Sequence, residues 1–389
     1  MKAFEPVNIA GISFRNRIIR SGTYEGMCDE NGYPGNDYYQ FYENLASAGA
    51  GGIITGFAYI SGEGRAMQPA QAGIDSHDKI AGLRTLTSRI HRHGCPVILQ
   101  IAHAGRQTVS RVTGMPVRGC SSKRSVYFRS KPVPFTTREV HDVINKFAEA
   151  AAYARAAGFD GVQVHAAHGY LVHQFLQPGI NNREDEFGID PQTGIGSQFL
   201  EAVISSVRQR CGNDFPVFVK ISGGEHFETI IRVLDRIRVD GIEVSYGTMD
   251  FPFNIFRGEV PVDLILAKNP FFATQNPVVK FMNRTIIDQW FRPQQIPFSS
   301  AYNVSFARNA KSITGIPVFV VGGFRKPGDI EDVLTSGDAD LVSLSRPFVA
   351  EPDIVLKMKN DRNYQSLCRN CNYCAVMCDS GKPTKCYQT

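Results

Sequence analysis

The sequence lacks three features: a membrane-spanning apolar segment, a signal peptide and a basic tract that would bind nucleic acid. It contains no run of about 20 apolar residues, so we expect no membrane-spanning helix and no membrane partner. Residues 1–17 lack the apolar core of a signal peptide, which favours a cytoplasmic protein. No basic tract suited to nucleic acid is present, and a formal net charge of +5 over 389 residues suits an anionic cofactor or substrate instead.

Cysteine is sparse over most of the chain and crowded at its end. Four of the nine cysteines are scattered between residues 28 and 211, and the other five fall within the last 22 residues. These five are Cys368, Cys371, Cys374, Cys378 and Cys386. Because no secretion signal is present, this crowding favours metal ligation in a reducing compartment over disulfide bonds.

Short apolar segments recur along the chain and are mostly separated by amphipathic segments of helical length. Eight of them predict buried parallel strands, at residues 17–22, 51–56, 96–102, 161–167, 216–222, 241–245, 317–323 and 341–346. Eight helices are predicted at residues 37–48, 77–93, 138–157, 197–211, 226–239, 304–313, 328–334 and 352–360. Thr136 and Glu139 form a capping-box signature before the third helix.

Eight strand–helix units predict a TIM (β/α)8 barrel, with a doubly wound sheet as the alternative. We divide the chain into a barrel, residues 1–360, and a short cysteine-rich C-terminal tail, residues 361–389. Two connections are long: residues 102–136 are rich in basic residues and proline, and residues 246–300 in Phe, Pro and Asn. Both are expected at the mouth of the barrel, where they either shape a substrate pocket or serve only as lids or oligomer contacts.

The chain is organised around residues 158–188, where two imidazoles and a phenol follow one predicted strand. His165 and His168 are three residues apart and could both point their N–H groups at one carbonyl oxygen, stabilising negative charge there. Tyr170 could deliver a proton to the adjacent carbon. The alternative is that these side chains only cap the strand and pack; a metal site is disfavoured because no third ligand sits at metal spacing.

Other strand ends carry groups suited to a phosphate and a heterocycle. Gly322 and Gly323 end the seventh strand, and Ser345 and Arg346 end the eighth, which is a recurrent phosphate-binding arrangement of backbone N–H groups with an added cation. Deeper in the mouth, the amide of Gln100 and the ammonium of Lys220 could bond a heterocycle, and a cation there would stabilise an anionic reduced flavin ring.

Several motifs, in order along nearly the whole barrel, carry a family resemblance. They are Asn16-Arg17-Ile18, Gly64-Arg65, QIAHAGR at 100–106, HAAHGYLVHQFLQPGINNREDEFG at 165–188, VGG at 321–323 and SRPF at 345–348. With them the chain resembles the old yellow enzyme family of FMN-dependent NAD(P)H:enone oxidoreductases. It looks most similar to the branch of 2,4-dienoyl-CoA reductase and trimethylamine dehydrogenase.

The resemblance implies a set of FMN contacts: Ser21, Gly22, Thr23, Phe57, Gln100, Lys220, Gly322, Gly323, Ser345 and Arg346. It implies that His165 and His168 bind the carbonyl oxygen of an α,β-unsaturated substrate and that Tyr170 is the proton donor. It implies ping-pong hydride transfer, in which NADH or NADPH reduces FMN and leaves before the enone binds. The chain departs from the family at Tyr24, where many members carry Cys or Thr, and at Phe57, where a small residue is usual.

The tail resembles the [4Fe-4S] ligand set of larger members of that branch. The resemblance implies the ligands Cys368, Cys371, Cys374 and Cys386. Three alternatives stay open: a ligand set with Cys378 in place of Cys368, a structural zinc site, and thiols that bind no metal. In the larger members the cluster serves an appended nucleotide-binding domain. The chain ends at Thr389, so we expect that domain to be absent, and an external donor, a fragment or a remnant motif are the alternatives.

The leading hypothesis is therefore an FMN oxidoreductase that reduces activated alkenes, with a small enone-type molecule as substrate. Two alternatives remain: a flavin dehydrogenase or demethylase acting on an amine or steroid-like substrate, and an electron-transfer module fed through the tail by a redox protein. The sequence leaves the choice of NADH or NADPH and a homo-oligomeric state open.

Overall fold

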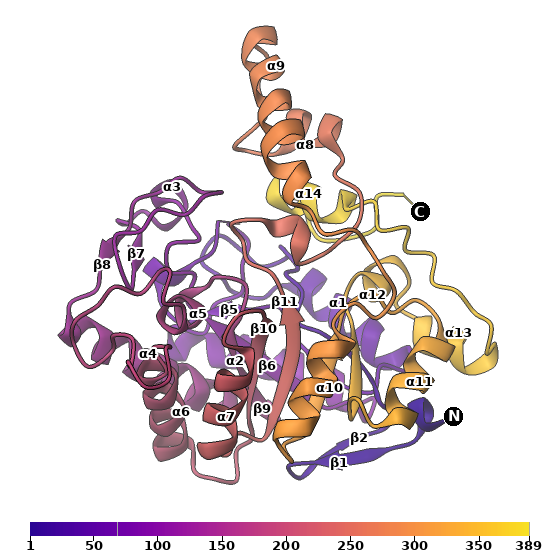
Figure 1. Cartoon of the computed structure of the whole chain (residues 1–389). Coiled ribbons are helices and arrows are strands. Elements are labelled where there is room, and N and C mark those ends of the chain that lie inside the picture. The colour runs from indigo at the N-terminus through magenta and orange to yellow at the C-terminus, as the bar shows by residue number, and fades with distance from the viewer. Residues whose placement is uncertain (68, 389) are drawn as a thin grey trace.

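In the computed structural model, which describes residues 1–67 and 69–388, eight parallel strands close into a barrel (Figure 1). Thr389, the last residue of the delimited tail, lies outside this range. The barrel strands are β3 (Ile18–Arg20), β4 (Ile53–Ile54), β6 (Val97–Ala102), β9 (Gly161–Ala166), β10 (Val217–Gly223), β11 (Gly241–Tyr246), β12 (Val318–Val321) and β13 (Leu341–Leu344). Pairing of β13 with β3 and of β4 with both β3 and β6 closes the ring. The predicted TIM barrel is confirmed.

A helix follows each barrel strand on the outside (Figure 1). The eight helices are α1 (Asn36–Ser47), α2 (Ile80–His91), α4 (Thr137–Ala156), α6 (Gln198–Cys211), α7 (Phe227–Arg236), α10 (Val304–Ile313), α11 (Pro327–Ser336) and α13 (Ile354–Asn360). Each matches a predicted helix to within a few residues. The capping box is present as predicted: the Thr136 hydroxyl accepts from Glu139 N, and the Glu139 carboxylate accepts from Thr136 N. None of the described helices combines the length and the apolar character that crossing a bilayer requires.

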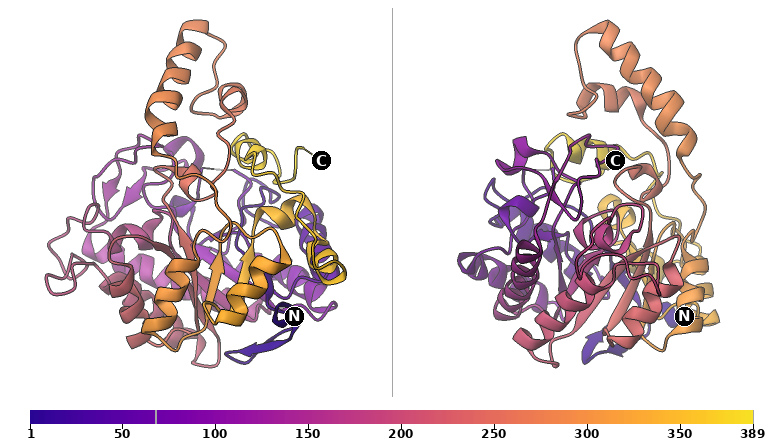
Figure 2. Two further views of the ribbon diagram at one scale, coloured as in Figure 1. Left: turned by 45° about the vertical axis from the view of Figure 1, so that its right-hand side comes forward. Right: turned by 60° about the vertical axis from the view of Figure 1, so that its left-hand side comes forward.

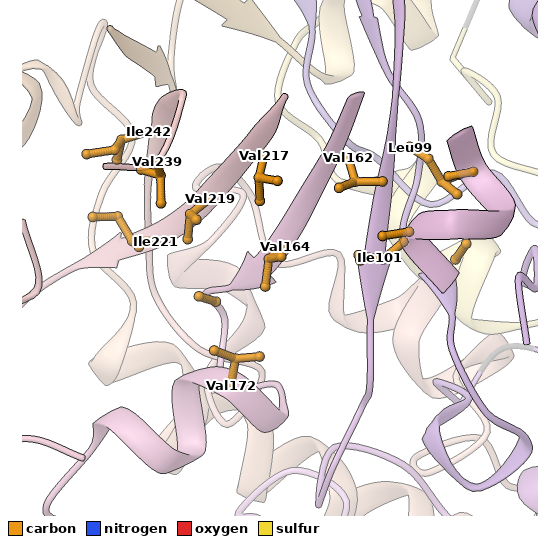
Figure 3. Close-up of a cluster of buried hydrophobic side chains, with 14 of the residues drawn as sticks. Leu99, Ile101, Val162, Val164, Val172, Val217, Val219, Ile221, Val239 and Ile242 are labelled. Carbon is orange, nitrogen blue, oxygen red and sulfur yellow. The ribbon is translucent and has the colours of Figure 1, made fainter. Parts of the chain in front are cut away.

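Alternate residues of each strand face opposite sides of the barrel wall, and this decides where the core lies. Figure 3 shows one outward set packed against the helices, including Leu99, Ile101, Val162, Val164, Val217, Val219 and Ile221. These side chains are buried, with at most 1% of their surface exposed. The strand runs are nearly continuous in apolar character because both faces are covered, as expected for a parallel sheet.

A hairpin before the barrel closes its N-terminal end. It consists of β1 (Val7–Ile9) and β2 (Ile12–Phe14), paired antiparallel. Phe14 packs against the inward side chains of the lowest layer of the barrel, Ile19, Ile54, Ile98, Phe218, Phe319 and Leu341. The sequence analysis did not predict this hairpin, because three-residue strands give too short an alternation to read. With this end plugged, the C-terminal mouth is the open end of the barrel.

Both long connections are folded rather than structureless. The connection at 102–136 contains α3 (Ser110–Thr113) and the paired β7 (Arg118–Gly119) and β8 (Val133–Pro134). The connection at 246–300 contains α8 (Val262–Lys268), α9 (Pro277–Ile286) and a π-helical turn, Ile287–Phe291. Residues 262–296, which we call the arm, project well beyond the body of the molecule from the mouth side (Figure 2).

The tail folds back over the mouth. Its helix α14 (Tyr373–Asp379) packs against α8 of the arm. The Glu351 carboxylate, just after the last barrel strand, accepts from Ser366 Oγ at 2.6 Å and Leu367 N at 2.7 Å, which fixes the start of the tail. Near its end, Thr384 N donates to Glu25 O at 2.7 Å. The tail therefore forms part of the roof above the barrel.

Candidate functional site

A cavity of about 210 Å³ opens at the mouth of the barrel, and residues from most of the strand ends line it. Twelve of the thirteen residues predicted for catalysis or FMN binding lie in its wall. They are Gly22, Thr23, Phe57, Gln100, His165, His168, Tyr170, Lys220, Gly322, Gly323, Ser345 and Arg346. Ser21 is fully buried just outside the wall and accepts a hydrogen bond from Lys220 Nζ at 2.8 Å. Residues separated by more than 300 positions are thus brought together as the strand ends converge.

The imidazoles and the phenol at the end of β9 form a compact group. The ring centroids of His165 and His168 lie 5.0 Å apart, and those of His165 and Tyr170 lie 4.9 Å apart. His168 has a left-handed backbone, with φ of 60°, which turns its ring back over the strand end. Its Nε2 lies 2.8 Å from Ser245 Oγ, so β11 fixes the orientation of the ring.

Both imidazoles are held neutral. Burial, together with the nearby Lys220 ammonium, lowers the pKa of His165 well below its usual value, and burial with the neighbouring His165 and Lys220 does the same to the pKa of His168. Burial raises the pKa of Tyr170, and the Asp379 carboxylate raises it further, so the phenol keeps its proton. His165 Nδ1 is buried and has no hydrogen-bond partner among the described residues.

A buried polar network forms the floor of the cavity, one layer above the apolar plug. Gln100 Nε2 donates to Gln163 Oε1 at 2.5 Å, and Gln163 Nε2 donates to Glu243 Oε2 at 3.1 Å. Lys220 Nζ lies 3.0 Å from Glu243 Oε2. Burial alone would raise the pKa of Glu243, but the Lys220 ammonium and hydrogen bonds from Ser21, Lys220 and Ser343 together outweigh it, and the pKa is lowered. The network fixes a cation and an amide beneath the cavity.

Gln163 and Glu243 were missed in the sequence analysis. Their signal is the strand alternation itself: each stands two residues beyond an inward-facing glycine, Gly161 or Gly241, in a strand that is otherwise apolar. A charged or amide side chain at an inward position of such a strand is expensive to bury unless it is bonded. Glu243, in the apolar strand sequence GIEVS, therefore predicts a buried polar group beneath the cavity as clearly as Lys220 does.

The end of the cavity lined by Gly322, Gly323 and Arg346 differs in one respect from the expected phosphate site. Arg346 lies in the wall, but its Nη1 donates to Asn372 Oδ1 at 2.6 Å and its Nη2 to Arg257 O at 2.9 Å, so it also anchors the tail and the loop after β11. A second cation, Arg325, lines the same end, and its Nε has no hydrogen-bond partner among the described residues. The sequence analysis missed Arg325, although it follows the Gly322-Gly323 turn by only two residues.

Aromatic rings line one side of the cavity. The centroids of Tyr24 and Phe57 are 6.0 Å apart, and those of Phe57 and Tyr170 are 5.1 Å apart. Gly22 faces this cavity, and a Cβ there would lie 2.7 Å from Gln100 Nε2, so glycine lets the chain approach the amide closely. A flat, partly apolar slot with amide and ammonium groups at its floor and cations at one end suits a phosphorylated aromatic heterocycle.

Four of the tail cysteines surround a second cavity of about 400 Å³ next to the first. Cys368, Cys371, Cys374 and Cys386 line it. Arg346 and Cys374 line both cavities, and Arg325 Nη2 lies 3.6 Å from Cys368 Sγ. All nine cysteines are free thiols. Among the described residues, no three His, Cys, Asp or Glu side chains converge closely enough to hold a single metal ion.

The fifth tail cysteine faces elsewhere. Cys378 is buried and lies in the wall of the first cavity, not of the second. Burial raises its pKa well above the usual thiol value, and the neighbouring Asp379 carboxylate raises it further. Of the two ligand sets left open by the sequence, the structure gathers the one without Cys378 around a common cavity.

Comparison with known proteins agrees with this geometry. A model of the NADH:flavin oxidoreductase / NADH oxidase family matches residues 2–245 and 271–365. The chain belongs to this family. The NADH oxidase of Thermoanaerobacter brockii is 26% identical over 389 residues, covering 97% of this chain and 54% of that protein. An NADPH dehydrogenase of Geobacillus sp. (strain WCH70) is 30% identical over 350 residues, covering 90% of this chain and 91% of that protein.

Among solved structures, the old yellow enzyme homologue from Zymomonas mobilis shares the fold, with a TM-score of 0.71 at 22% identity and coverage of 94% of both chains. The predicted resemblance to the old yellow enzyme family is confirmed, while the branch within it stays a prediction. The chain spans about half the length of the NADH oxidase that it matches. The family model does not match residues 246–270 or those after 365, which pack on each other through α8 and α14 above the mouth.

Proposed function

We propose that this family member binds FMN in the mouth cavity and reduces the activated C=C bond of α,β-unsaturated carbonyl compounds, with NADH or NADPH as reductant. The observation that carries the proposal is the pair of neutral imidazoles beside a protonated phenol in one cavity. A neutral imidazole has one N–H to donate. Two of them can bond one carbonyl oxygen and stabilise the enolate charge that develops on it.

Tyr170 fits the role of proton donor. Its ring lies 4.9 Å from that of His165, so one substrate can bring its carbonyl oxygen to the imidazoles and its α-carbon to the phenol. The raised pKa keeps the proton on the oxygen until the α-carbon gains negative charge. Oxyanion stabilisation and proton donation are each typically worth on the order of 100-fold or more in rate.

The residues that would hold FMN are those already placed in the cavity wall. Lys220 and Gln100 form the floor against a ring system, and the backbone of Gly322 and Gly323 with Arg346 and Arg325 would receive the phosphate. When bound, FMN supplies the hydride-transfer chemistry that the side chains lack. The Glu243 carboxylate holds the Lys220 ammonium in place from below.

For the tail we propose a [4Fe-4S] cluster held by Cys368, Cys371, Cys374 and Cys386. The support is that these four thiols, and not Cys378, line one cavity of about 400 Å³. Thiols spaced around such a volume suit a cluster of several irons better than one zinc ion, which needs four ligand atoms converging on a single point. Arg325 Nη2, at 3.6 Å from Cys368 Sγ, puts a positive charge beside these sulfur atoms.

The test begins with the absorbance spectrum of the anaerobically purified protein, which reports flavin and cluster together. A His165→Ala/His168→Ala variant is then mixed, as the reduced holoenzyme, with a cyclic enone. We expect flavin to stay bound and enone-dependent reoxidation to fall by at least 100-fold. His141→Ala, on the exposed face of α4, is the control and should behave as the parent protein.

Two outcomes would overturn the proposal. Full enone reduction by the double variant would remove the imidazoles from the mechanism. Reduction of the flavin by a ferredoxin-like protein but not by NADH or NADPH would point to an electron-transfer module instead.

A further inference from the structure

The face around the mouth of the barrel carries most of the exposed apolar bulk of the molecule. Large apolar side chains with the greatest exposure lie on the arm: Phe281 at 71%, Val278 at 66%, Met282 at 56% and Trp290 at 55%. The connection at 102–136 adds Met115, Val126 and Val133, each at least 40% exposed. Large exposed apolar side chains gathered on one segment, as on the arm, mark a candidate interaction site.

The apolar side chains of α9 occupy a broad outer face. At about 100° per residue, Val278, Phe281 and Met282 fall on one side of the helix, and Val279 and Ile286 extend it to nearly half of the circumference. The opposite side turns toward the arm itself: Asn283 Nδ2 donates to Phe272 O at 2.9 Å, and Ile287 is buried. A stripe this wide exceeds the narrow seam of a coiled coil and suits a helix lying in an interface plane.

The charge on the same face is positive. Residues 103–136 contain seven cations and no carboxylate, in a chain whose formal net charge is +5. Arg106 and Arg118 are paired with Asp250 and Glu139. The other five meet no carboxylate among the described residues and are exposed: Arg111, Lys123, Arg124, Arg129 and Lys131. The arm adds four cations against two carboxylates, and Arg284 and Arg292 are paired with Asp263 and Asp288.

The basic connection and the arm form one surface. Arg111 stacks over the ring of Phe271, with 5.1 Å from its Cζ to the centroid, and Tyr127 and Phe128 pack against the same ring. Asn269 Nδ2 donates to Tyr127 OH at 2.8 Å, which ties the start of the arm to the connection. In both views of Figure 2 the arm rises from the mouth end of the barrel, and the contacts of Arg111 and Tyr127 with Phe271 join the basic connection to it.

We propose that this face docks on an anionic lipid surface, with the outer side of α9 buried among the headgroups and the exposed cations of residues 111–131 against anionic lipids. The exposed apolar side chains of α9 and the unpaired cations of residues 111–131 supply the two contributions to interfacial binding, apolar burial and charge attraction. The expectation of no membrane partner rested on the lack of a spanning helix, which does not bear on a helix that lies on the surface.

A second copy of the chain fits less well. A second copy of the chain would cover the apolar side of α9 but, with a formal net charge of +5, offers no excess of negative charge for the exposed cations of residues 111–131. A soluble anionic substrate would account for the cations but not for the exposed Phe281 and Met282.

The experiment uses vesicles and the flavin-loaded protein. Co-sedimentation is measured with vesicles of phosphatidylcholine alone and of equal parts phosphatidylcholine and phosphatidylglycerol. Trp290 is the single tryptophan of the chain, so its emission reports directly on the arm. We expect binding and a blue shift with the mixed vesicles, weaker binding to phosphatidylcholine alone, and release by high salt.

Two variants separate the apolar and the charge contributions. Phe281→Ser/Met282→Ser should abolish binding, and Lys123→Gln/Arg124→Gln should weaken it by about fivefold per cation removed. Leu356→Ser removes a side chain that is 44% exposed on α13 and should bind as the parent does. All three should keep their NAD(P)H-dependent turnover in vesicle-free buffer, which shows that the fold is intact.

Three results would overturn the proposal. One is the absence of binding to the mixed vesicles, or binding that the Phe281→Ser/Met282→Ser variant retains. Another is a blue shift that grows with protein concentration without vesicles, which would assign the face to a second copy. The third is vesicle-free binding of coenzyme A that is lost in Lys123→Gln/Arg124→Gln, which would assign the cations to a soluble anion.

Discussion

The rings of His165 and His168 lie nearly perpendicular, at 88°, with their centroids 5.0 Å apart. Two imidazoles this close in a buried site cannot both carry a positive charge. The pKa of each is lowered well below 6.5 by burial and by neighbouring positive charge. Their N–H groups therefore stay in the neutral, donating form across the physiological range.

This predicts a particular pH profile for enone reduction. With the chemically reduced holoenzyme, the rate of reoxidation by an enone should stay constant from about pH 8 down to pH 5.5, because neither imidazole gains a proton there. Stopped-flow absorbance of the flavin over a pH series measures it. A fall in rate that titrates near pH 6.5 would contradict the neutral pair.

Tyr170→Phe tests the proton donor separately from carbonyl binding. The change removes one hydroxyl from a buried ring and leaves the packing against Phe57 and His165 in place. We expect enone reduction to slow by about 100-fold while flavin reduction by NAD(P)H is unchanged. Rapid-mixing measurement of the two half-reactions distinguishes the steps. An equal loss in both half-reactions would instead indicate a damaged flavin site.

The buried histidines also predict how stability depends on pH. Burial lowers the pKa of His103 and of His173 to about 4, whereas an unfolded chain protonates histidine near pH 6.5. Below pH 6.5 the two histidines therefore bind protons in the unfolded state but stay neutral in the folded state. The free energy of unfolding falls as the pH drops toward 4. Each such group should cost about 2 kcal/mol by pH 5.

Urea unfolding of the parent and of His103→Asn at pH 7.5 and pH 5 measures this. His103 accepts from Gly105 N at 3.0 Å through its Nδ1, and the Asn carbonyl keeps an acceptor in its place. The variant should lose less stability between the two pH values than the parent does, by about 2 kcal/mol. An equal loss in both proteins would show that other groups carry the acid sensitivity.

The sequence predicted the barrel well because its signals are local and repeated. α10 coincides with the predicted helix at residues 304–313, and Thr136 with Glu139 caps α4 as expected. Convergence of strand ends then brought twelve of the predicted site residues together without any knowledge of contacts. Periodicity and strand order are sufficient for that much of the site.

What the sequence could not give depends on contacts between distant segments. The anchoring of Arg346 to Asn372 requires the tail to fold back across the mouth, and no pattern along the chain encodes that path. The exposure of Phe281 could not be predicted for the same reason. An apolar residue in a helix is normally buried, and Phe281 is exposed because no other segment of the described chain packs over it. Both depend on how segments distant in the sequence pack.

The buried pair beneath the cavity gives a prediction about stability. Lys220 and Glu243 are 3% and 0% exposed at their side chains and lie 3.0 Å apart. Lys220→Met leaves the Glu243 carboxylate buried without its cation and should lower the free energy of unfolding by about 3–5 kcal/mol. Lys220→Met/Glu243→Gln removes both charges and should recover part of that loss. Thermal unfolding of the four proteins in a double-mutant cycle measures the coupling, and additive effects would contradict the pairing.

The last prediction separates two cysteines that stand only eight residues apart. Cys386 lines the cavity that holds Cys368, Cys371 and Cys374, whereas Cys378 faces the mouth of the barrel. Cys386→Ser should therefore lower iron and acid-labile sulfide sharply, since a serine hydroxyl is a poor substitute for a cluster thiolate. Cys378→Ser should leave both unchanged, because the thiol there is buried and its pKa is raised. Iron loss in the Cys378 variant with retention in the Cys386 variant would instead select the other ligand set, and a parent protein without iron would leave the four thiols to a different role.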